Sequence, residues 1–376
     1  MAFKNTHPKT LIIAEAGVNH NGSLDRALEM INVAAQLGAD IVKFQTFQSA
    51  QVVSSKAPKA EYQRVSKQLE GAKEEESLLE MARKLELDYQ AHHTMLQRAK
   101  EKQIEFLSSP FDIPSLKLLN DDLKLVRLKI ASGEITNFPF LMALARSGKN
   151  LILSSGASTL GEVEAALGVL AFGLITPENF QPNGAKIELD DFKSAFCSEE
   201  GQQALKKKVS LLHCTTEYPA RVEDVNLRAM DTMRDAFGLP VGLSDHTVGI
   251  SVPIAAVARG ASIIEKHFTL DKTLPGPDHT ASLNPQEFGA MVKGIREIER
   301  SLGDGIKRPT KAEIKNIPVI RRSLITVRKI SKGEKFTEKN LTTKRPGTGV
   351  SAVYYWSAIG RVAARDYQKD EIVDSF

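Results

Sequence analysis

The chain has 376 residues, of which 42% are apolar and 26% are charged, and these proportions are typical of a folded globular protein rather than a disordered one. Its 50 Lys and Arg against 46 Asp and Glu leave a formal charge of +4 without a long basic run, so a nucleic-acid partner is not expected. The two cysteines, Cys197 and Cys214, form no CxxC motif, which excludes a disulfide framework and argues against a structural zinc site. Without a signal-peptide pattern or an apolar stretch long enough to span a bilayer, the chain is expected to be cytoplasmic and without a membrane partner.

Short apolar or β-branched runs recur along the chain and predict eight β-strands. They are Leu11–Ala14, Ile41–Phe44, Ile104–Leu107, Val126–Ile130, Leu151–Leu153, Val209–Leu212, Val241–Leu243 and Ser262–Glu265. Segments with helical periodicity alternate with them: Leu24–Leu37, Leu87–Lys102, Ser115–Asn120, Phe140–Ser147, Leu160–Phe172, Leu227–Phe237, Ile250–Arg259 and Phe288–Leu302. Strict alternation predicts a parallel α/β sheet, and eight repeats predict a closed (β/α)8 TIM barrel. An open doubly wound sheet is the alternative, but its GxGxxG motif is missing after the first strand.

Two connections between the predicted elements are much longer than the others. Residues 46–103 follow the second strand and residues 155–208 follow the fifth. Long insertions in a barrel usually lie in the loops of the catalytic face, so both are expected there. The acidic run Glu188–Asp191 in the second insertion is interpreted as a solvated surface.

After the last predicted helix, the helical periodicity of the sequence ends. The Gly-, Pro- and Arg-containing stretch Gly303–Pro309 indicates a linker. From Pro318 onward the pieces are short and strand-like, which predicts a small β-rich domain whose packed core, or an interface, accounts for the tryptophan Trp356. The predicted organisation is a barrel over residues 1–305, a linker over 306–317 and a small domain over 318–376.

Polar residues cluster at the carboxyl ends of the predicted strands, where TIM barrels place their catalytic groups. A lysine on a barrel strand is costly to bury without an anion, so Lys43 and Lys129 predict a bound phosphate or carboxylate. The hydroxyl groups of Ser109, Ser132, Ser154 and Ser244 are candidate donors to that anion. The alternative is a structural salt bridge from these lysines to Glu15 or Glu134.

Two histidines, His246 and His267, end the neighbouring seventh and eighth strands. Two imidazole ligands with further positions left for substrate oxygens suit a catalytic divalent metal better than a closed structural zinc site. Taken singly, each histidine is better explained as a hydrogen-bonded core residue, whereas the pair together favours the metal. His7, His92 and His93 are expected to be solvated.

Two rival functions are open at this point. In the first, the barrel is an aldolase or a related condensing enzyme, with Lys129 as a Schiff-base nucleophile, although its serine-rich setting suits an anion better. In the second, residues 318–376 form a non-catalytic carbohydrate- or ice-binding module on a scaffold barrel, which leaves the polar strand ends unexplained.

A series of ordered motifs resembles one enzyme family over almost the whole chain. The motifs are AEAGVNHNG at 14–22, VKFQT at 42–46, SSPF at 108–111, KIASGE at 129–134, HCTTEYP at 213–219, GLSDHT at 242–247, EKHFT at 265–269 and PGPD at 275–278. Together they resemble the sialic acid (N-acetylneuraminate) synthases and their relatives for legionaminic and pseudaminic acids. The stretch KRPGTG at 344–349 resembles the antifreeze-like (SAF) domain of these enzymes.

The resemblance implies a transferase that condenses phosphoenolpyruvate with an N-acylated amino sugar to give a nine-carbon 2-keto acid and phosphate. N-acetylmannosamine, and hence N-acetylneuraminate synthesis, is the expected acceptor and activity. A 2,4-diacetamido sugar of legionaminate or pseudaminate synthesis, or N-acetylmannosamine 6-phosphate, is the alternative acceptor. The family also implies a divalent metal, with Mn²⁺ expected and Mg²⁺ or Co²⁺ as alternatives, and a domain-exchanged homodimer.

The resemblance also assigns roles to individual residues. His246 and His267 match the metal ligands, and Glu15 and Glu134 match carboxylates near the reacting centre. The positions around phosphoenolpyruvate match Lys43, Ser109, Lys129, Ser132, Ser154, Thr216 and Ser244, and those near the sugar match Glu15, Gln45, Tyr218 and Asp278. Arg345 matches an arginine that the partner subunit lends to the acyl group of the sugar. Two departures stand out: Thr216 replaces an asparagine found in some members, and the 172–208 insertion is longer than the family leads one to expect.

Overall fold

The computed structural model describes residues 9–59, 77–177 and 186–376. The chain divides into two compact units, residues 1–304 and residues 305–376. None of the helices in the described ranges is long and apolar enough to cross a membrane.

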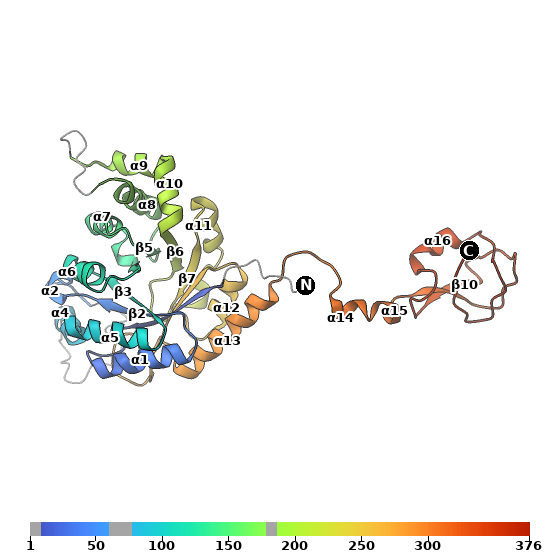
Figure 1. Ribbon diagram of the computed structural model, residues 1–376, viewed down its shortest axis with the longest axis horizontal. Coiled ribbons are helices and arrows are strands. Elements are labelled where there is room, and N and C mark those ends of the chain that lie inside the picture. The colour runs from blue at the N-terminus through green and yellow to red at the C-terminus, as the bar shows by residue number, and fades with distance from the viewer. Residues whose placement is uncertain (1–8, 60–76, 178–185) are drawn as a thin grey trace. The chain divides into compact units, whose positions relative to one another are not determined.

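The first unit is built on eight parallel strands that form a TIM barrel (Figure 1). The strands are β1 Leu11–Gly17, β2 Ile41–Thr46, β3 Glu105–Pro110, β4 Arg127–Ile130, β5 Asn150–Ser154, β6 Val209–Cys214, β7 Val241–Asp245 and β8 Ile263–His267. They follow the order β3-β2-β1-β8-β7-β6-β5-β4, and β3 also lies beside β4, so the sheet curls round on itself. The fold class predicted from the alternation of strands and helices is therefore confirmed.

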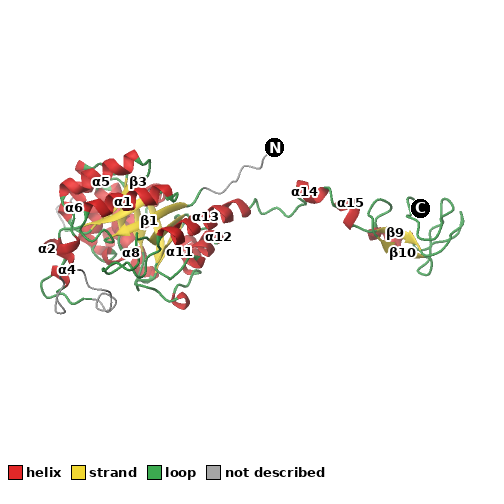
Figure 2. Cartoon of the chain, turned by 90° about the horizontal axis from the view of Figure 1, so that it is seen from below, coloured by secondary structure: helices red, strands yellow, loops and turns green. Residues whose placement is uncertain are grey.

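Helices cover the outside of the strands, as Figure 2 shows. Those that follow the barrel strands are α1 Leu24–Gln36, α5 Tyr89–Glu101, α6 Ile113–Lys117, α7 Phe138–Arg146, α8 Leu160–Ile175, α11 Ala229–Phe237, α12 Ser251–Ala258 and α13 Pro285–Ser301. Several begin at residues whose side chains cap the helix, for example Asp88 before α5, Thr159 before α8 and Asn284 before α13. The apolar residues of these helices and the outward side chains of the strands form the main core.

Two layers of side chains fill the inside of the barrel. The lower layer is apolar and consists of Ile13, Ile41, Leu107, Ile152, Leu212 and Ile263. Because side chains two residues apart on a strand share a face, the residues two positions further on form the next layer. That layer contains Glu15, Lys43, Ser109, Ser154, Cys214 and Glu265. The barrel interior therefore changes from apolar to charged toward the carboxyl ends of its strands.

Most strands extend further than their apolar runs predict. β1 continues to Gly17, β2 to Thr46 and β3 to Pro110. The strands were predicted from runs of apolar residues, and these runs end where the inner side chains of the barrel become polar or charged. Polar residues such as Glu15 and Gln45 therefore lie on the strands themselves, where backbone hydrogen bonds to neighbouring strands hold them in place.

The two long connections contain additional helices. In the first, α2 Ser49–Val52 and α4 Leu78–Leu85 precede α5, and both views show α2 and α4 side by side. In the second, α9 Leu189–Cys197 and α10 Glu199–Lys208 lead into β6. The ring of Phe192 on α9 packs edge-on against Phe172 of α8, so this insertion is attached to the barrel helices. Glu188 and Asp190 at the start of α9 are exposed, as expected for the acidic run.

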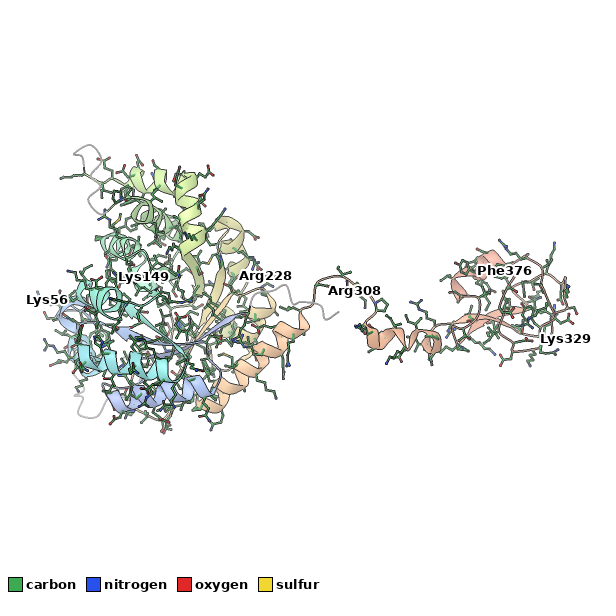
Figure 3. The ribbon with its side chains drawn as sticks, in the orientation of Figure 1. Lys56, Lys149, Arg228, Arg308, Lys329 and Phe376 are labelled. Carbon is green, nitrogen blue, oxygen red and sulfur yellow. The ribbon has the colours of Figure 1, made fainter. Side chains whose placement is uncertain are left out.

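The second unit has a core of its own around two antiparallel strands, β9 Ser323–Thr326 and β10 Leu341–Lys344. Short helices α14 Lys311–Ile314 and α15 Ile317–Ile320 precede β9, and α16 Tyr355–Ala358 follows β10. Figure 3 draws its side chains, among them Phe376, whose ring lies 6.5 Å from that of the buried Phe336. Trp356 is 73% exposed, so of the two explanations offered for it, a packed core and an interface, the packed core is wrong.

Candidate active site

Four charged side chains meet inside the upper layer of the barrel, and all are almost completely buried. Lys43 Nζ lies 2.7 Å from Glu15 Oε2 and 3.7 Å from Glu265 Oε1. Lys129 Nζ lies 3.6 Å from the same Glu265 oxygen. Glu15, Lys43, Lys129 and Glu265 are called the charged layer below.

The pKa values of the two carboxyl groups of the charged layer are shifted in opposite directions. Burial raises the pKa of Glu15 to about 7, because loss of solvent outweighs the nearby Lys43. Burial also opposes ionisation of Glu265, but Lys129 and Lys43 together hold the pKa of that carboxyl below its usual range. Glu265 is therefore the permanent counter-charge, while Glu15 can bind and release a proton near neutral pH.

Serine hydroxyl groups border the charged layer. Lys129 Nζ donates to Ser154 Oγ over 2.7 Å, and Lys43 Nζ lies 3.4 Å from Ser109 Oγ. Ser244 Oγ donates to Glu265 Oε1 over 3.0 Å. The structure thus brings together the lysines and three of the four serines predicted to hold an anion. It also contains the alternative salt bridge between Lys43 and Glu15, and the anion remains a prediction.

His246 and His267 lie next to each other at the ends of β7 and β8, with ring centroids 5.4 Å apart. The ring of Tyr218 lies 4.2 Å from that of His246 and stands nearly perpendicular to that of His267. Burial lowers the pKa of His246 to about 4 and that of His267 well below its ordinary value. Both imidazoles are therefore neutral near pH 7, the form that binds a metal.

The two histidines fit a metal with few protein ligands. His246 Nδ1 lies 2.6 Å from the carbonyl oxygen of Thr215, which leaves Nε2 as the ligand atom, and such a backbone contact orients many metal-binding histidines. His267 Nδ1 is buried without a hydrogen-bond partner. Over the described part of the chain, three or more His, Cys, Asp or Glu side chains nowhere gather in a metal-binding arrangement. A cation at this pair would need oxygen ligands from substrate or water.

The candidate sugar-binding residues converge around Gly17, which has a positive φ of 50°. A Cβ at this position would lie 3.2 Å from Glu15 Oε1, 3.4 Å from Gln45 Nε2 and 3.5 Å from Asp278 Oδ2. Burial raises the pKa of Asp278 to about 6. These polar atoms therefore meet next to the histidine pair, since Asp278 Oδ2 is also 3.8 Å from His267 Nδ1.

A second convergence surrounds Gly156 on the other side of the charged layer. A Cβ here would collide with Thr216 Oγ1 and come within 3.0 Å of Ser132 Oγ. Only glycine leaves room between these hydroxyl groups, whose oxygens are 3.4 Å apart. Thr216 is exposed and Ser132 half-buried, so this corner opens to solvent.

Two expected site residues, Glu134 and Arg345, are not among those that the first unit brings together in the charged layer or at the histidine pair. Glu134 is half-buried and accepts a hydrogen bond from Asn137 over 2.7 Å, and it is not one of the residues that form ion pairs in the charged layer. Arg345 belongs to the second unit, where its exposed side chain donates to the carbonyl oxygen of Ile320 over 3.0 Å. Of the two carboxylates expected at the reacting centre, only Glu15 lies in the charged layer.

Two buried residues were missed as site components. Glu265 stands two residues before His267 on β8, and the period of a strand could have placed it on the inner face. Lys266, on the outer face, is fully buried and lies 2.5 Å from Asp245 Oδ2, so this ion pair joins the ends of β7 and β8 behind both histidines.

The expectation of solvated histidines is wrong for His92. Its side chain is 2% exposed, and its Nε2 is 3.0 Å from Thr46 Oγ1. His93 is half-buried, and His7 lies outside the described residues.

Comparisons with known proteins give a consistent result. Residues 30–307 match the NeuB family and residues 321–374 match the SAF domain. The chain is 49% identical to N,N'-diacetyllegionaminic acid synthase of Campylobacter jejuni over 365 residues, which cover 97% of this chain and 99% of that protein. It is 43% identical to the protein of the same name from Legionella pneumophila, over 90% of this chain and 86% of that one. The solved structure of the N-acetylneuraminic acid synthetase of Leptospira borgpetersenii has a TM-score of 0.64 and 33% identity, with coverage of 82% of this chain and 90% of that one.

Proposed function

Because the chain belongs to the NeuB family and carries a SAF domain, we propose that it condenses phosphoenolpyruvate with a 2,4-diacetamido sugar to give an N,N'-diacetyllegionaminic acid and phosphate. The resemblance found in the sequence motifs is confirmed, and so is the expected class of enzyme, a phosphoenolpyruvate-dependent synthase of transferase type. The proposed acceptor is the alternative given above, a 2,4-diacetamido sugar, and not the expected N-acetylmannosamine.

The choice of acceptor rests on the nitrogen content of the product. The two relatives at 49% and 43% identity are both named for a diacetylated product, whereas the sialic acid synthetase is 33% identical. Phosphoenolpyruvate contains no nitrogen, so both acetamido groups of such a product must come from the sugar. This supports a diacetamido sugar over N-acetylmannosamine and its 6-phosphate.

The charged layer is the proposed site of phosphoenolpyruvate. Lys43 and Lys129 would neutralise its phosphate and carboxylate groups, with hydroxyl donors from Ser109, Ser154 and Ser244. The open corner at Ser132 and Thr216 would take further oxygens of the phosphate. Burial lowers the pKa of Lys129, so an added anion would stabilise its charged form and hold the donor in place.

Gln45, Tyr218 and Asp278 are proposed to orient the open-chain sugar, so that its aldehyde carbon faces C3 of phosphoenolpyruvate. A divalent metal, expected to be Mn²⁺, would be held by His246 and His267 and would supply Lewis-acid polarisation of the aldehyde. The buried, neutral imidazoles and the ring nitrogen of His267 that lacks a hydrogen-bond partner support this assignment, with His246 Nε2 3.5 Å from Ser244 Oγ as its other ligand atom.

Once C3 of phosphoenolpyruvate has bonded to the aldehyde carbon, water must add at C2 before phosphate leaves. Glu15 is the proposed base for that water, because it is buried beside Lys43 and has a pKa of about 7. Glu134, the other candidate, is half-buried and bonded to Asn137, so its proposed part is limited to the rim of the site.

We further propose that the enzyme is a domain-exchanged homodimer in the cytoplasm, in which the partner chain lends its arginine at position 345 to the sugar. The exposure of Arg345 supports this, because an arginine on a separate unit is available to another chain.

A phosphate-release assay tests the acceptor. Purified enzyme is supplied with phosphoenolpyruvate, Mn²⁺ and one of three sugars: 2,4-diacetamido-2,4,6-trideoxymannose, N-acetylmannosamine or N-acetylmannosamine 6-phosphate. We expect the highest kcat/KM with the diacetamido sugar. A higher value with either mannosamine would overturn the proposed acceptor, and no phosphate release with any of them would overturn the condensation itself.

A further inference from the structure

Beside the histidine pair lies a cavity of about 280 Å³ with two chemically different walls. Gln45, Tyr218, His267 and Asp278 supply the polar wall described above. The opposite wall comes from the first insertion and is formed by Val52, Val53, Leu78, Met81, Ala82 and Leu85, with Phe47 and Phe111 at its edge. These last eight residues are called the apolar wall.

The apolar wall is not part of the core that holds the barrel together. Met81, Ala82 and Leu85 of α4 are less than 9% exposed, yet neither they nor Phe47 and Phe111 belong to the core clusters of the first unit. Burial of apolar side chains normally serves to join a helix to the core. Here the inner face of α4 instead borders the cavity.

Contacts outside the wall hold α4 in place. Ser77 and Glu80 form a reciprocal cap at its first turn. At its other end, Glu86 accepts a hydrogen bond from the backbone of Ser49 at the start of α2, and Gly22 approaches the carbonyl oxygen of Lys84 so closely that a Cβ would collide with it. The contacts from Ser49 and Gly22 therefore link the C-terminal end of α4 to neighbouring elements and help to position the wall.

We propose that the apolar wall binds the methyl end of the second acetamido group of the sugar and thereby selects a diacetamido acceptor over N-acetylmannosamine. A hydroxyl group facing Met81 and Leu85 would lose its hydrogen bonds to water without a replacement, whereas a methyl group gains by leaving water. The first acetamido group is left to the arginine at position 345 that the partner chain is proposed to lend. This inference rests on the proposed function, because it presupposes that a sugar occupies the cavity.

The test compares the ratio of kcat/KM for the diacetamido sugar to kcat/KM for N-acetylmannosamine in wild type and variants. Met81→Gln keeps the length of the side chain and makes the wall polar, and one apolar group in a pocket typically changes such ratios by about 10- to 200-fold. We expect the ratio to fall at least about tenfold in Met81→Gln and to stay near wild type in Met81→Leu. Arg83→Gln, on the exposed face of the same helix, is the matched control and should leave the ratio unchanged.

Val53→Thr is a second, milder variant, since Val53 is half-buried at the end of α2 and threonine has nearly the same shape. It should lower the ratio in the same direction. If both variants retain the wild-type ratio, or lose activity equally with both sugars, the assignment of the wall is overturned. If the wild type itself shows no preference for the diacetamido sugar, the proposed acceptor fails instead, so the two failures are distinguishable.

Discussion

At the scale of single residues, burial keeps several histidines neutral at pH values where they are normally protonated. His20 is 1% exposed, and its Nδ1 accepts a hydrogen bond from the backbone of Gly22 over 3.0 Å. Burial, with smaller contributions from His92 and Arg26, lowers the pKa of His20 to about 3. The folded protein therefore lacks a proton that the unfolded chain binds below pH 6.5.

This linkage predicts the effect of His20→Asn on stability. Between pH 6.5 and about 3 the unfolded wild type takes up a proton at His20 and the folded protein does not, so acid favours unfolding and stability rises with pH through this window. The difference in unfolding free energy between pH 7 and pH 5 should be about 2 kcal/mol smaller in the variant.

Urea unfolding at the two pH values measures this difference, and near-UV circular dichroism at pH 7 checks that the variant is folded. An identical pH dependence in wild type and variant would mean that His20 titrates normally in the folded protein.

Residue-level reasoning from the sequence found the charged layer only in part. Lys43 and Lys129 could be singled out because a buried lysine requires compensation. Glu265 was not given a role, although the two-residue period of β8 places it on the face of His267. His92 could not be recognised as buried, because its partner Thr46 lies on another element and that contact exists only in the folded chain.

At the scale of elements, the close approach of two backbones fixes the position of α4. Gly22 has a φ of 73°, and a Cβ there would collide with the carbonyl oxygen of Lys84. Gly148 has a similar φ of 66° but nothing within 4 Å of its Cβ position. Alanine variants of Gly22 and Gly148 would therefore share the strain of a positive φ, but only the Gly22 variant would add a collision with the backbone of α4.

Gly22→Ala should displace α4 and with it the apolar wall, whereas Gly148→Ala should not. Both variants carry the strain of alanine at positive φ, about 1 kcal/mol. Only Gly22→Ala is expected to raise the KM for the sugar, by about tenfold, with the Kd for phosphoenolpyruvate little changed. Steady-state kinetics and a binding titration measure the two constants. Equal sugar KM values in the two variants would show that α4 does not depend on this contact.

The alternation of elements could be predicted from the sequence, and the strand starts agree with the apolar runs to within a residue in most cases. Two aspects of the elements could not be predicted. Strand ends were placed too early, because the charged layer interrupts the apolar pattern on which the prediction relied. The short helices α2 and α4 were not recognised, since α4 directs its apolar side to a cavity and not to the core.

At the scale of the whole molecule, the two units have separate cores, and the residues proposed for the site are divided between them. The charged layer and the histidine pair belong to the first unit, and Arg345 belongs to the second. Motif resemblance assigned Arg345 to the site of another chain, a relation that spacing along one sequence cannot reveal. If the proposed dimer exists, inactive variants in the two units should complement each other.

Arg345→Ala and His246→Ala should each be inactive or severely impaired as homodimers, and co-expression should restore activity. If the arginine acts on the partner chain, a mixed dimer has one complete site. That site combines the first unit of the Arg345→Ala chain, which keeps His246, with Arg345 of the His246→Ala chain. Random pairing should then give about a quarter of wild-type activity. Differently tagged chains allow the mixed dimer to be purified and assayed. No recovery in the purified mixed dimer would place Arg345 in its own chain's site, and a fully active Arg345→Ala homodimer would place it outside any site.

The apolar wall has a consequence for how this enzyme and its relatives diverge. The groups proposed to perform the condensation lie on barrel strands, where a change of one residue disturbs a buried layer. Most of the wall lies on the two short helices α2 and α4. Neither helix contributes a residue to the core clusters of the barrel. Mutations in α2 and α4 are therefore expected to disturb folding less than mutations in the barrel core, and if the wall binds the sugar as proposed, acceptor preference can change there while the condensing groups stay the same.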